Sequence, residues 1–110
     1  MLNQLVIVGR LTDNPQVKKT EKGKSVTSIT VAVPRSFKNP EGLYETDFIP
    51  CVLWNGIADS TSLYCKKGDI VGVKGRIQVS EYNDKENNKR FKTECIAEKI
   101  TFLTSKKTEE

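Results

Sequence analysis

Residues 46–54 read Thr-Asp-Phe-Ile-Pro-Cys-Val-Leu-Trp, and they form the most informative predicted strand of the sequence. Side chains of an extended chain alternate between two faces. One face of the predicted strand carries three apolar residues that we expect in the core: Ile49, Cys51 and Leu53. The opposite face is also apolar and has an aromatic ring at each end: Phe48, Pro50, Val52 and Trp54. A single sheet buries only one face, so the second face must meet another sheet or a flat ligand.

The composition limits the classes of protein to consider. A chain of 110 residues suits one domain whose core needs no crosslinks. Its three cysteines are far apart and odd in number, so we expect free thiols and a cytoplasmic location. Histidine is absent, which removes the usual general base and metal ligand, and we expect no enzyme, no metal and no cofactor. Apolar runs are too short to cross a membrane. The net charge of +4 suits nucleic acid but also many unrelated domains.

Four more stretches alternate as strands do, and turn-forming residues separate them. The predicted strands cover residues 3–11, 27–33, 71–82 and 90–103. In the first strand, Val6 and Val8 form a second apolar row opposite Leu5 and Ile7. That row either meets another chain or is enclosed within one barrel, and the pattern leaves both possibilities open.

Two prolines and one short helix complete the local predictions. Pro34 predicts a bulge or a strand end, and Pro50 requires an unpaired edge or a bulge because proline has no N–H to donate. Ile57, Thr61, Tyr64 and Cys65 recur at helical spacing and predict about two turns of helix. Gly68 suits the position just after the end of that helix.

Five strands with one short helix between the third and the fourth predict an all-β fold. This arrangement is the five-stranded oligonucleotide/oligosaccharide-binding (OB) barrel. A long hairpin, with a polar tip at residues 83–89, joins the fourth and fifth strands.

The sequence resembles bacterial single-stranded DNA-binding proteins of the homotetrameric type. The resemblance runs nearly end to end. Its motifs, in order, are residues 5–15, Gly23, residues 29–32, 46–54, 64–69, 73–76 and Tyr82. It implies sequence-independent binding and protection of single-stranded DNA during replication, recombination and repair, by a homotetramer located in the cytoplasm at the nucleoid.

The resemblance also implies which residues contact the strand. The stacking aromatics of the family map onto Phe37, Phe48, Trp54 and Tyr82. Any single ring is more often core than ligand contact, yet the last three share the face opposite the core. We expect phosphate contacts from the cations on or beside that face: Arg10, Arg35, Lys38, Lys74, Arg76, Arg90 and Lys92.

The chain departs from the family pattern at several positions. Where relatives often carry basic residues, it has Pro50, Gly56, Gln78, Ser80 and Glu81, which shifts the expected phosphate path. We expect residues 1–104 to form the single DNA-binding domain and the charged residues 105–110 to be disordered. The acidic C-terminal tail with which the family recruits replication and repair proteins has no counterpart after Glu110. Such partners are therefore expected only if the natural chain has a tail, and a trimmed core and a short paralogue both remain open.

Two rival functions are compatible with the same fold. The aromatic face could meet protein, as in a primosomal-type accessory module, or it could bind RNA, because stacking does not report a 2′-hydroxyl. Catalysis by a carboxylate pair is disfavoured, since the candidate acids lie next to turns or strand ends, where solvated acids are ordinary: Asp13, Glu45, Asp47 and Asp69.

Overall fold

The computed structural model describes residues 1–104, and the predicted disordered end, residues 105–110, lies outside the described part. The described residues form five long strands, one two-residue strand and one helix, joined by turns and loops. In chain order they are β1 (Leu5–Leu11), β2 (Lys18–Lys19), β3 (Ser25–Lys38), β4 (Tyr44–Trp54), α1 (Asn55–Tyr64), β5 (Ile70–Asn83) and β6 (Lys89–Phe102). The predicted third and fourth strands are thus β4 and β5, with α1 between them.

The strands form one sheet that closes on itself. Their order is β1-β5-β6-β4-β3-β2, and β1 also pairs with β3, so the five long strands make a closed barrel. All pairings are antiparallel except that of β4 with β6, which is parallel and covers only Cys51 with Cys95 and Val52 with Ile96. Strand number, closure and helix position confirm the predicted OB fold.

Close backbone approach at two glycines allows the barrel to close. A Cβ atom on Gly9 would collide with the carbonyl oxygen of Ala32, where β1 crosses onto β3. A Cβ atom on Gly75 would collide with the carbonyl oxygen of Ile96, at the point where the β5–β6 register shifts. Only glycine fits such contacts without displacing a neighbouring strand.

The barrel interior is filled by the predicted apolar rows. Cys51 and Leu53 are fully buried, and Ile49 packs against the core from a partly buried position. Leu5 and Ile7 also pack against the core, whereas Val6 and Val8 on the other face of β1 are exposed. The alternation read from the sequence therefore identified the core face of both strands.

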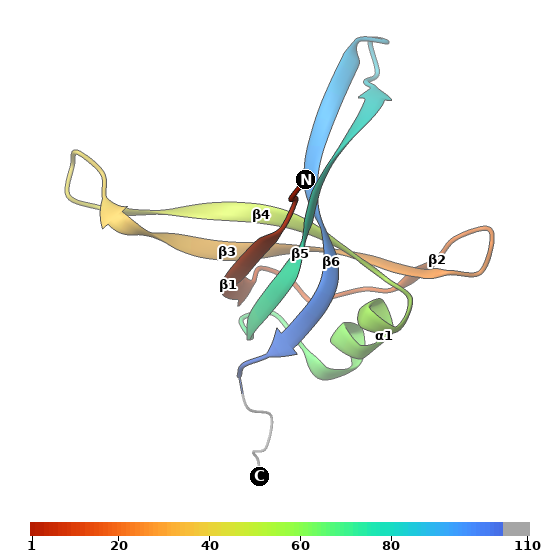
Figure 1. Ribbon diagram of the computed structural model, residues 1–110, viewed down its shortest axis with the longest axis horizontal. Helices are drawn as coiled ribbons and strands as arrows, with labels where there is room; N and C mark the ends of the chain where they lie inside the picture. The colour runs from red at the N-terminus through yellow and green to blue at the C-terminus, as the bar shows by residue number, and fades with distance from the viewer. Residues whose placement is uncertain (105–110) are drawn as a thin grey trace.

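The β3–β4 and β5–β6 hairpins extend beyond the barrel in different directions, as two arms (Figure 1). The β3–β4 arm contains a register shift between Pro34 and Lys38, which confirms the bulge predicted at Pro34, and β3 continues past it. Pro50 pairs with Thr30 of β3, while the pairing of β4 with β6 begins only at Cys51. The edge of β4 beside Pro50 is therefore open on the β6 side, which suits a residue without an N–H.

Helix α1 lies against the barrel beside β3, β4 and β6 (Figure 1). Ala58 and Thr61 form its buried side, and Tyr64 is exposed with its ring 6.0 Å from that of Phe102. The role predicted for Gly68 is wrong: the helix ends at Tyr64, and Gly68 takes its positive φ of 91° in a separate turn. That turn is closed by the N–H of Asp69 donating to Lys66. Within residues 1–104, no helix has the length and apolar character needed to cross a membrane.

Candidate nucleic-acid interface

Two of the predicted stacking rings lie on the outer face of β4. Phe48 is 64% exposed and Trp54 is 38% exposed, whereas Cys51 and Leu53 between them are buried on the inner face. The strand thus presents two rings outward, six residues apart, which is about 20 Å along an extended strand. Rings held in this way on a rigid strand are available to flat ligands.

Val52 departs from the prediction that placed it with these rings. It is only 8% exposed, although it does not belong to the core cluster. Val52 lies opposite Ser28 of β3 and also opposite Ile96 of β6. Because strands flank it on both edges at this point, the neighbouring side chains cover it. The exposed face of β4 is therefore interrupted between Phe48 and Trp54.

Phe48 lies on the rim of an apolar hollow between the two arms. The hollow is lined by Leu5, Ile7, Asp47, Phe48, Ile49, Pro50, Ile77, Thr93, Glu94 and Cys95. Adjacent residues of β4 line it together because β6 leaves this edge of β4 uncovered before Cys51. Bases stacked on Phe48 would have apolar surface beside them.

The end of the β3–β4 arm carries a second aromatic group. Phe37 lies within the irregular stretch of β3, between Pro34 and Lys38, and is exposed. The Nζ atom of Lys38 lies 5.8 Å from the centre of the Tyr44 ring, and these two residues are paired across the hairpin. Tyr44 is exposed and was not among the predicted site residues. Its even spacing with Thr46 and Phe48 along one strand was the signal that could have identified it.

Tyr82 lies on the outer face of the β5–β6 arm together with cations. It is 51% exposed and pairs directly with Arg90. Paired residues share a face, and residues of equal parity along a strand do so too, so Arg76 and Lys92 lie on the same side of this arm. The structure thus brings together the ring and three of the predicted phosphate-binding cations on one arm.

Most of these cations already have a partner in the protein. Arg76 donates to Gln78 at 2.9 Å, and Arg10 donates to the carbonyl of Gly68 at 2.9 Å. Arg90 donates to Asp84 at 2.9 Å, which keeps the guanidinium beside the hairpin tip. The pKa of Asp84 is lowered, first by a backbone N–H from Asn88 and then by Arg90. Lys92 lies 3.2 Å from a carboxylate oxygen of Glu94.

Arg35 is the most strongly engaged of the predicted cations. Its guanidinium lies 2.8 Å from Glu45 and 2.9 Å from Asp47, both on β4. A second donor, Nε, lies 3.1 Å from the other oxygen of Asp47, so the contact is bidentate. The hydrogen bond from Arg35 lowers the pKa of Asp47. Two carboxylates around one arginine make this part of the arm net negative, which opposes the approach of a phosphate.

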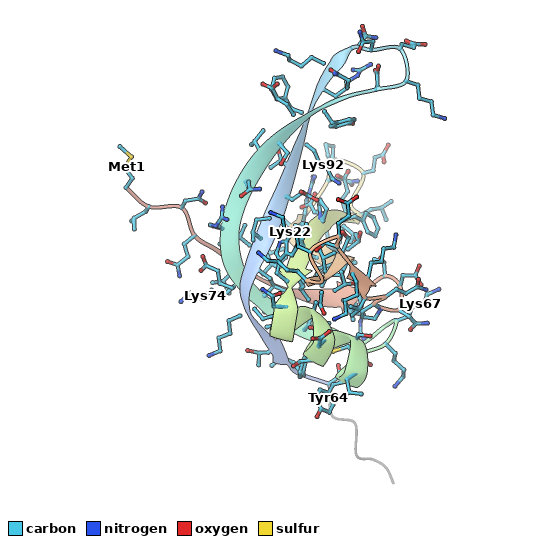
Figure 2. The ribbon with its side chains drawn as sticks, turned by 90° about the vertical axis from the view of Figure 1, so that its right-hand side faces the viewer. Met1, Lys22, Tyr64, Lys67, Lys74 and Lys92 are labelled. Atoms are coloured by element: carbon cyan, nitrogen blue, oxygen red, sulfur yellow. The ribbon has the colours of Figure 1, made fainter. Side chains whose placement is uncertain are left out.

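Lys74 lies apart from the other predicted cations. It pairs with Val6 of β1, and with Val6, Val8 and Leu103 it lines an apolar hollow. Figure 2 shows Lys74 on the left-hand side of the view, the side on which Met1 also lies, while Lys22 and Lys92 lie nearer its centre. Lys74 therefore belongs to the β1 side of the barrel.

Phe91 is a second exposed ring on the β5–β6 arm that was not a predicted site residue. It is 63% exposed and pairs with Glu81, on the face opposite to Tyr82. Ile77 and Val79 share its face and are also exposed. The arm thus has one aromatic and cationic face and one largely apolar face.

A closed five-stranded barrel with exposed rings and cations on its strands defines the class of OB-fold nucleic-acid-binding proteins. The chain belongs to the single-strand binding protein family, whose model matches residues 2–103. Family membership confirms the resemblance seen in the sequence.

Individual relatives match over most of this chain. It is 44% identical to single-stranded DNA-binding protein B of Bacillus subtilis (strain 168), over 99% of this chain and 96% of that protein. It is 40% identical to single-stranded DNA-binding protein 1 of Clostridium acetobutylicum, over 96% of this chain and 97% of that protein. A third relative, the single-stranded DNA-binding protein of Halalkalibacterium halodurans, is 46% identical over 94% of this chain, which spans only 61% of its length.

Proposed function

We propose that this protein binds single-stranded DNA without sequence preference and protects it during replication, recombination and repair. The observation that carries the proposal is the outward placement of Phe48 and Trp54 on one barrel strand, in a chain of the single-strand binding protein family. Every base has a π-face, so stacking on such rings tolerates any sequence. The role is binding, without catalysis and without a cofactor.

The proposed contacts divide between bases and phosphates. Bases stack on the four predicted rings: Phe37, Phe48, Trp54 and Tyr82. Phosphates meet the seven predicted cations, and the partners already bound by Arg35, Arg90 and Lys92 must release them or share them. Stacking contributes about 1–3 kcal/mol per base, and each phosphate contact adds salt dependence.

Trp54 reports binding directly because it is the only tryptophan in the sequence. We expect oligothymidine to quench its emission in proportion to the strand bound, and duplex DNA of equal length to quench much less. In competition, oligouridine should displace oligothymidine poorly. Absence of both quenching and a mobility shift with oligothymidine would overturn the proposal, and preferential binding of oligouridine would reassign the protein to RNA.

Replacing the ring separates the two possible roles of Trp54. Trp54→Ala should weaken binding of dye-labelled oligothymidine by about 1–3 kcal/mol, measured by anisotropy, with an unchanged melting temperature. A core tryptophan would instead lower the stability by about 3–5 kcal/mol. Unchanged affinity with a large fall in melting temperature would remove Trp54 from the binding surface.

We further propose that the protein is a homotetramer. Support comes from β1, where Val6 and Val8 expose an apolar row that continues to Leu103 across a shared hollow. Exposed apolar patches of this kind mark contacts between chains, and closed symmetry is the usual outcome. Sedimentation should give four chains, and Val8→Asp should give smaller species. A monomer at micromolar concentration would contradict the proposal.

Location and further partners follow from the proposed binding. A protein that coats single strands acts at the DNA, so we place it in the cytoplasm at the nucleoid. Residues 1–104 would supply the DNA-binding domain, and recruitment of replication and repair proteins would require a tail in the natural chain. A fluorescent fusion that followed the nucleoid would support this location, and a diffuse one would contradict it.

A further inference from the structure

A hollow lies beside Trp54 at the turn between β2 and β3. It is lined by Thr20, Glu21, Lys22, Lys24 and Trp54. The ring at the end of β4 is thus brought against a turn from much earlier in the chain, because β3 connects the two. None of the lysines in this hollow belongs to the seven predicted phosphate contacts.

The turn that carries the two lysines is fixed by its own hydrogen bonds. The N–H of Thr20 donates to the carbonyl of Lys24 at 2.9 Å, and the N–H of Lys24 donates to the Thr20 hydroxyl at 3.1 Å. The N–H of Gly23 donates to Thr20 at 2.9 Å, and Gly23 has a positive φ of 83°. Such a turn holds Lys22 and Lys24 close to the ring without using their ammonium groups.

Strand pairing brings a third lysine to the same face. Lys18 of β2 lies opposite Val26 of β3, and Val26 lies opposite Trp54 of β4. Residues directly opposite one another share a face of the sheet. The face that presents the Trp54 ring therefore continues onto a lysine at its edge.

The ammonium groups of Lys22 and Lys24 are available to a ligand. Both residues are exposed, and within residues 1–104 neither side chain forms a hydrogen bond or an ion pair. In contrast, Arg35, Arg90 and Lys92 are bound to carboxylates. Glu21 is the one acid lining the hollow, so the hollow is net positive. Lysine binds phosphate as a compact point charge on a flexible stem.

We propose that Trp54, Lys22 and Lys24 form a nucleotide subsite of the single-strand track, in which the base stacks on Trp54 and the flanking phosphates bind the two lysines. This inference rests on the proposed function. It continues the path of the bound strand from Phe48, past the buried Val52, to Trp54 and the β2–β3 turn. This turn and the hairpin near Arg35 lie at opposite ends of β3 (Figure 1). Lys22 and Lys24 would supply phosphate contacts that Arg35, Arg90 and Lys92 supply less readily, because those three side chains are bound to carboxylates.

The test compares two charge-matched double variants of the full chain. Lys22→Ala with Lys24→Ala removes the proposed phosphate-binding groups, and Lys66→Ala with Lys67→Ala removes two exposed lysines from the turn after α1. For a single strand, removing one phosphate-binding cation flattens the slope of log K against log salt by about 0.7. At 0.1 M salt this corresponds to about fivefold in affinity per cation. We therefore expect the first variant to bind oligothymidine about 25-fold more weakly, with a slope flatter by about 1.4.

The controls separate this inference from the function on which it rests. The Lys66/Lys67 variant should change affinity less than threefold, and Lys22→Arg with Lys24→Arg should restore the slope. Suppose that oligothymidine quenches the Trp54 emission of the unmodified protein, but that the Lys22/Lys24 variant has the same affinity and salt slope as the Lys66/Lys67 variant. The proposed subsite is then wrong, and the proposed function stands. If the unmodified protein itself shows no binding, the proposed function fails first.

Discussion

Tyr82 of β5 and Arg90 of β6 lie directly opposite each other, so a ring and a guanidinium share one face of the β5–β6 arm. Phe91, next to Arg90, lies on the other face with similar exposure. We expect Tyr82→Ala to weaken oligothymidine binding by about 1–3 kcal/mol and Phe91→Ala to leave it nearly unchanged. Anisotropy titration with both variants checks this. Equal losses of affinity in the two variants would show that the bound DNA does not distinguish between the two faces of the arm.

Lys74 and Arg76 are two residues apart on β5 but differ in their surroundings. Lys74 faces Val6 and the apolar row of β1, whereas Arg76 lies further along towards Tyr82. We expect Arg76→Ala to flatten the salt slope by about 0.7 and Lys74→Ala to flatten it less. Lys74→Ala should also alter the concentration at which the chains dissociate, because Lys74 lies beside the apolar row of β1. A larger salt effect at Lys74 than at Arg76 would move the phosphate path onto the β1 side.

The alternation of side chains predicted most of the barrel, because a strand with one buried face places every second side chain in the core, and this pattern is visible in the sequence. It identified Cys51 and Leu53 as core and the rings of Phe48 and Trp54 as exposed. It failed at Val52, where β3 and β6 both flank β4, because the number of neighbouring strands at a position depends on topology. The alternation of side chains along one strand does not tell how many other strands flank each position.

The candidate site was predictable in its residue types but not in its electrostatic partners. Rings and cations were found from their positions along each strand. The engagement of Arg35 by Glu45 and Asp47 depends on the register of two strands around the Pro34 bulge. The hollow beside Trp54 likewise requires β2, β3 and β4 to be adjacent, and a two-residue strand such as β2 has no pattern of its own.

Gly9 and Gly56 provide a matched test of barrel closure. A Cβ atom at Gly9 meets backbone of β3, while a Cβ atom at Gly56 in α1 meets open space. Gly9→Ala should therefore lower the free energy of unfolding by about 1–3 kcal/mol, as overpacking does. Gly56→Ala should keep or raise it by up to about 1 kcal/mol, because alanine favours helix. Thermal melting distinguishes them, and an unchanged melting temperature for Gly9→Ala would show that β1 shifts without cost.

Cys51 gives the protein a specific response to alkaline pH. Burial, and then the neighbouring Cys95, raise the pKa of its thiol from 9.0 to about 12. Between these values the unfolded chain loses the proton and the folded chain keeps it, so unfolding becomes more favourable as pH rises. The contribution of the Cys51 thiol to the free energy of unfolding should be fully present below pH 9. Above pH 9 it should decrease by up to about 1.4 kcal/mol per pH unit. In Cys51→Ala, the free energy of unfolding should decrease less between neutral and alkaline pH than it does in the unmodified protein. Denaturant melts at several pH values measure this.

We expect carboxylates and phosphate to compete for Arg35. Asp47 holds the guanidinium through two oxygens, at 2.9 and 3.1 Å, and the same contact lowers the pKa of Asp47. Asp47→Asn removes one negative charge from the β3–β4 arm and leaves Arg35 held only by Glu45. We expect this variant to bind oligothymidine several-fold more tightly and with a steeper salt slope, because a freed arginine adds up to about 0.7 to that slope.

Acid should have the same effect in the unmodified protein. As the pH falls through the lowered pKa of Asp47, protonation releases the guanidinium, so the advantage of Asp47→Asn should shrink towards low pH. Asp59→Asn, an exposed acid of α1, is the control for loss of charge alone. If Asp47→Asn and Asp59→Asn changed the affinity equally, the effect would be general charge. If Asp47→Asn weakened binding, the carboxylate would be positioning Arg35 for phosphate instead of competing with it.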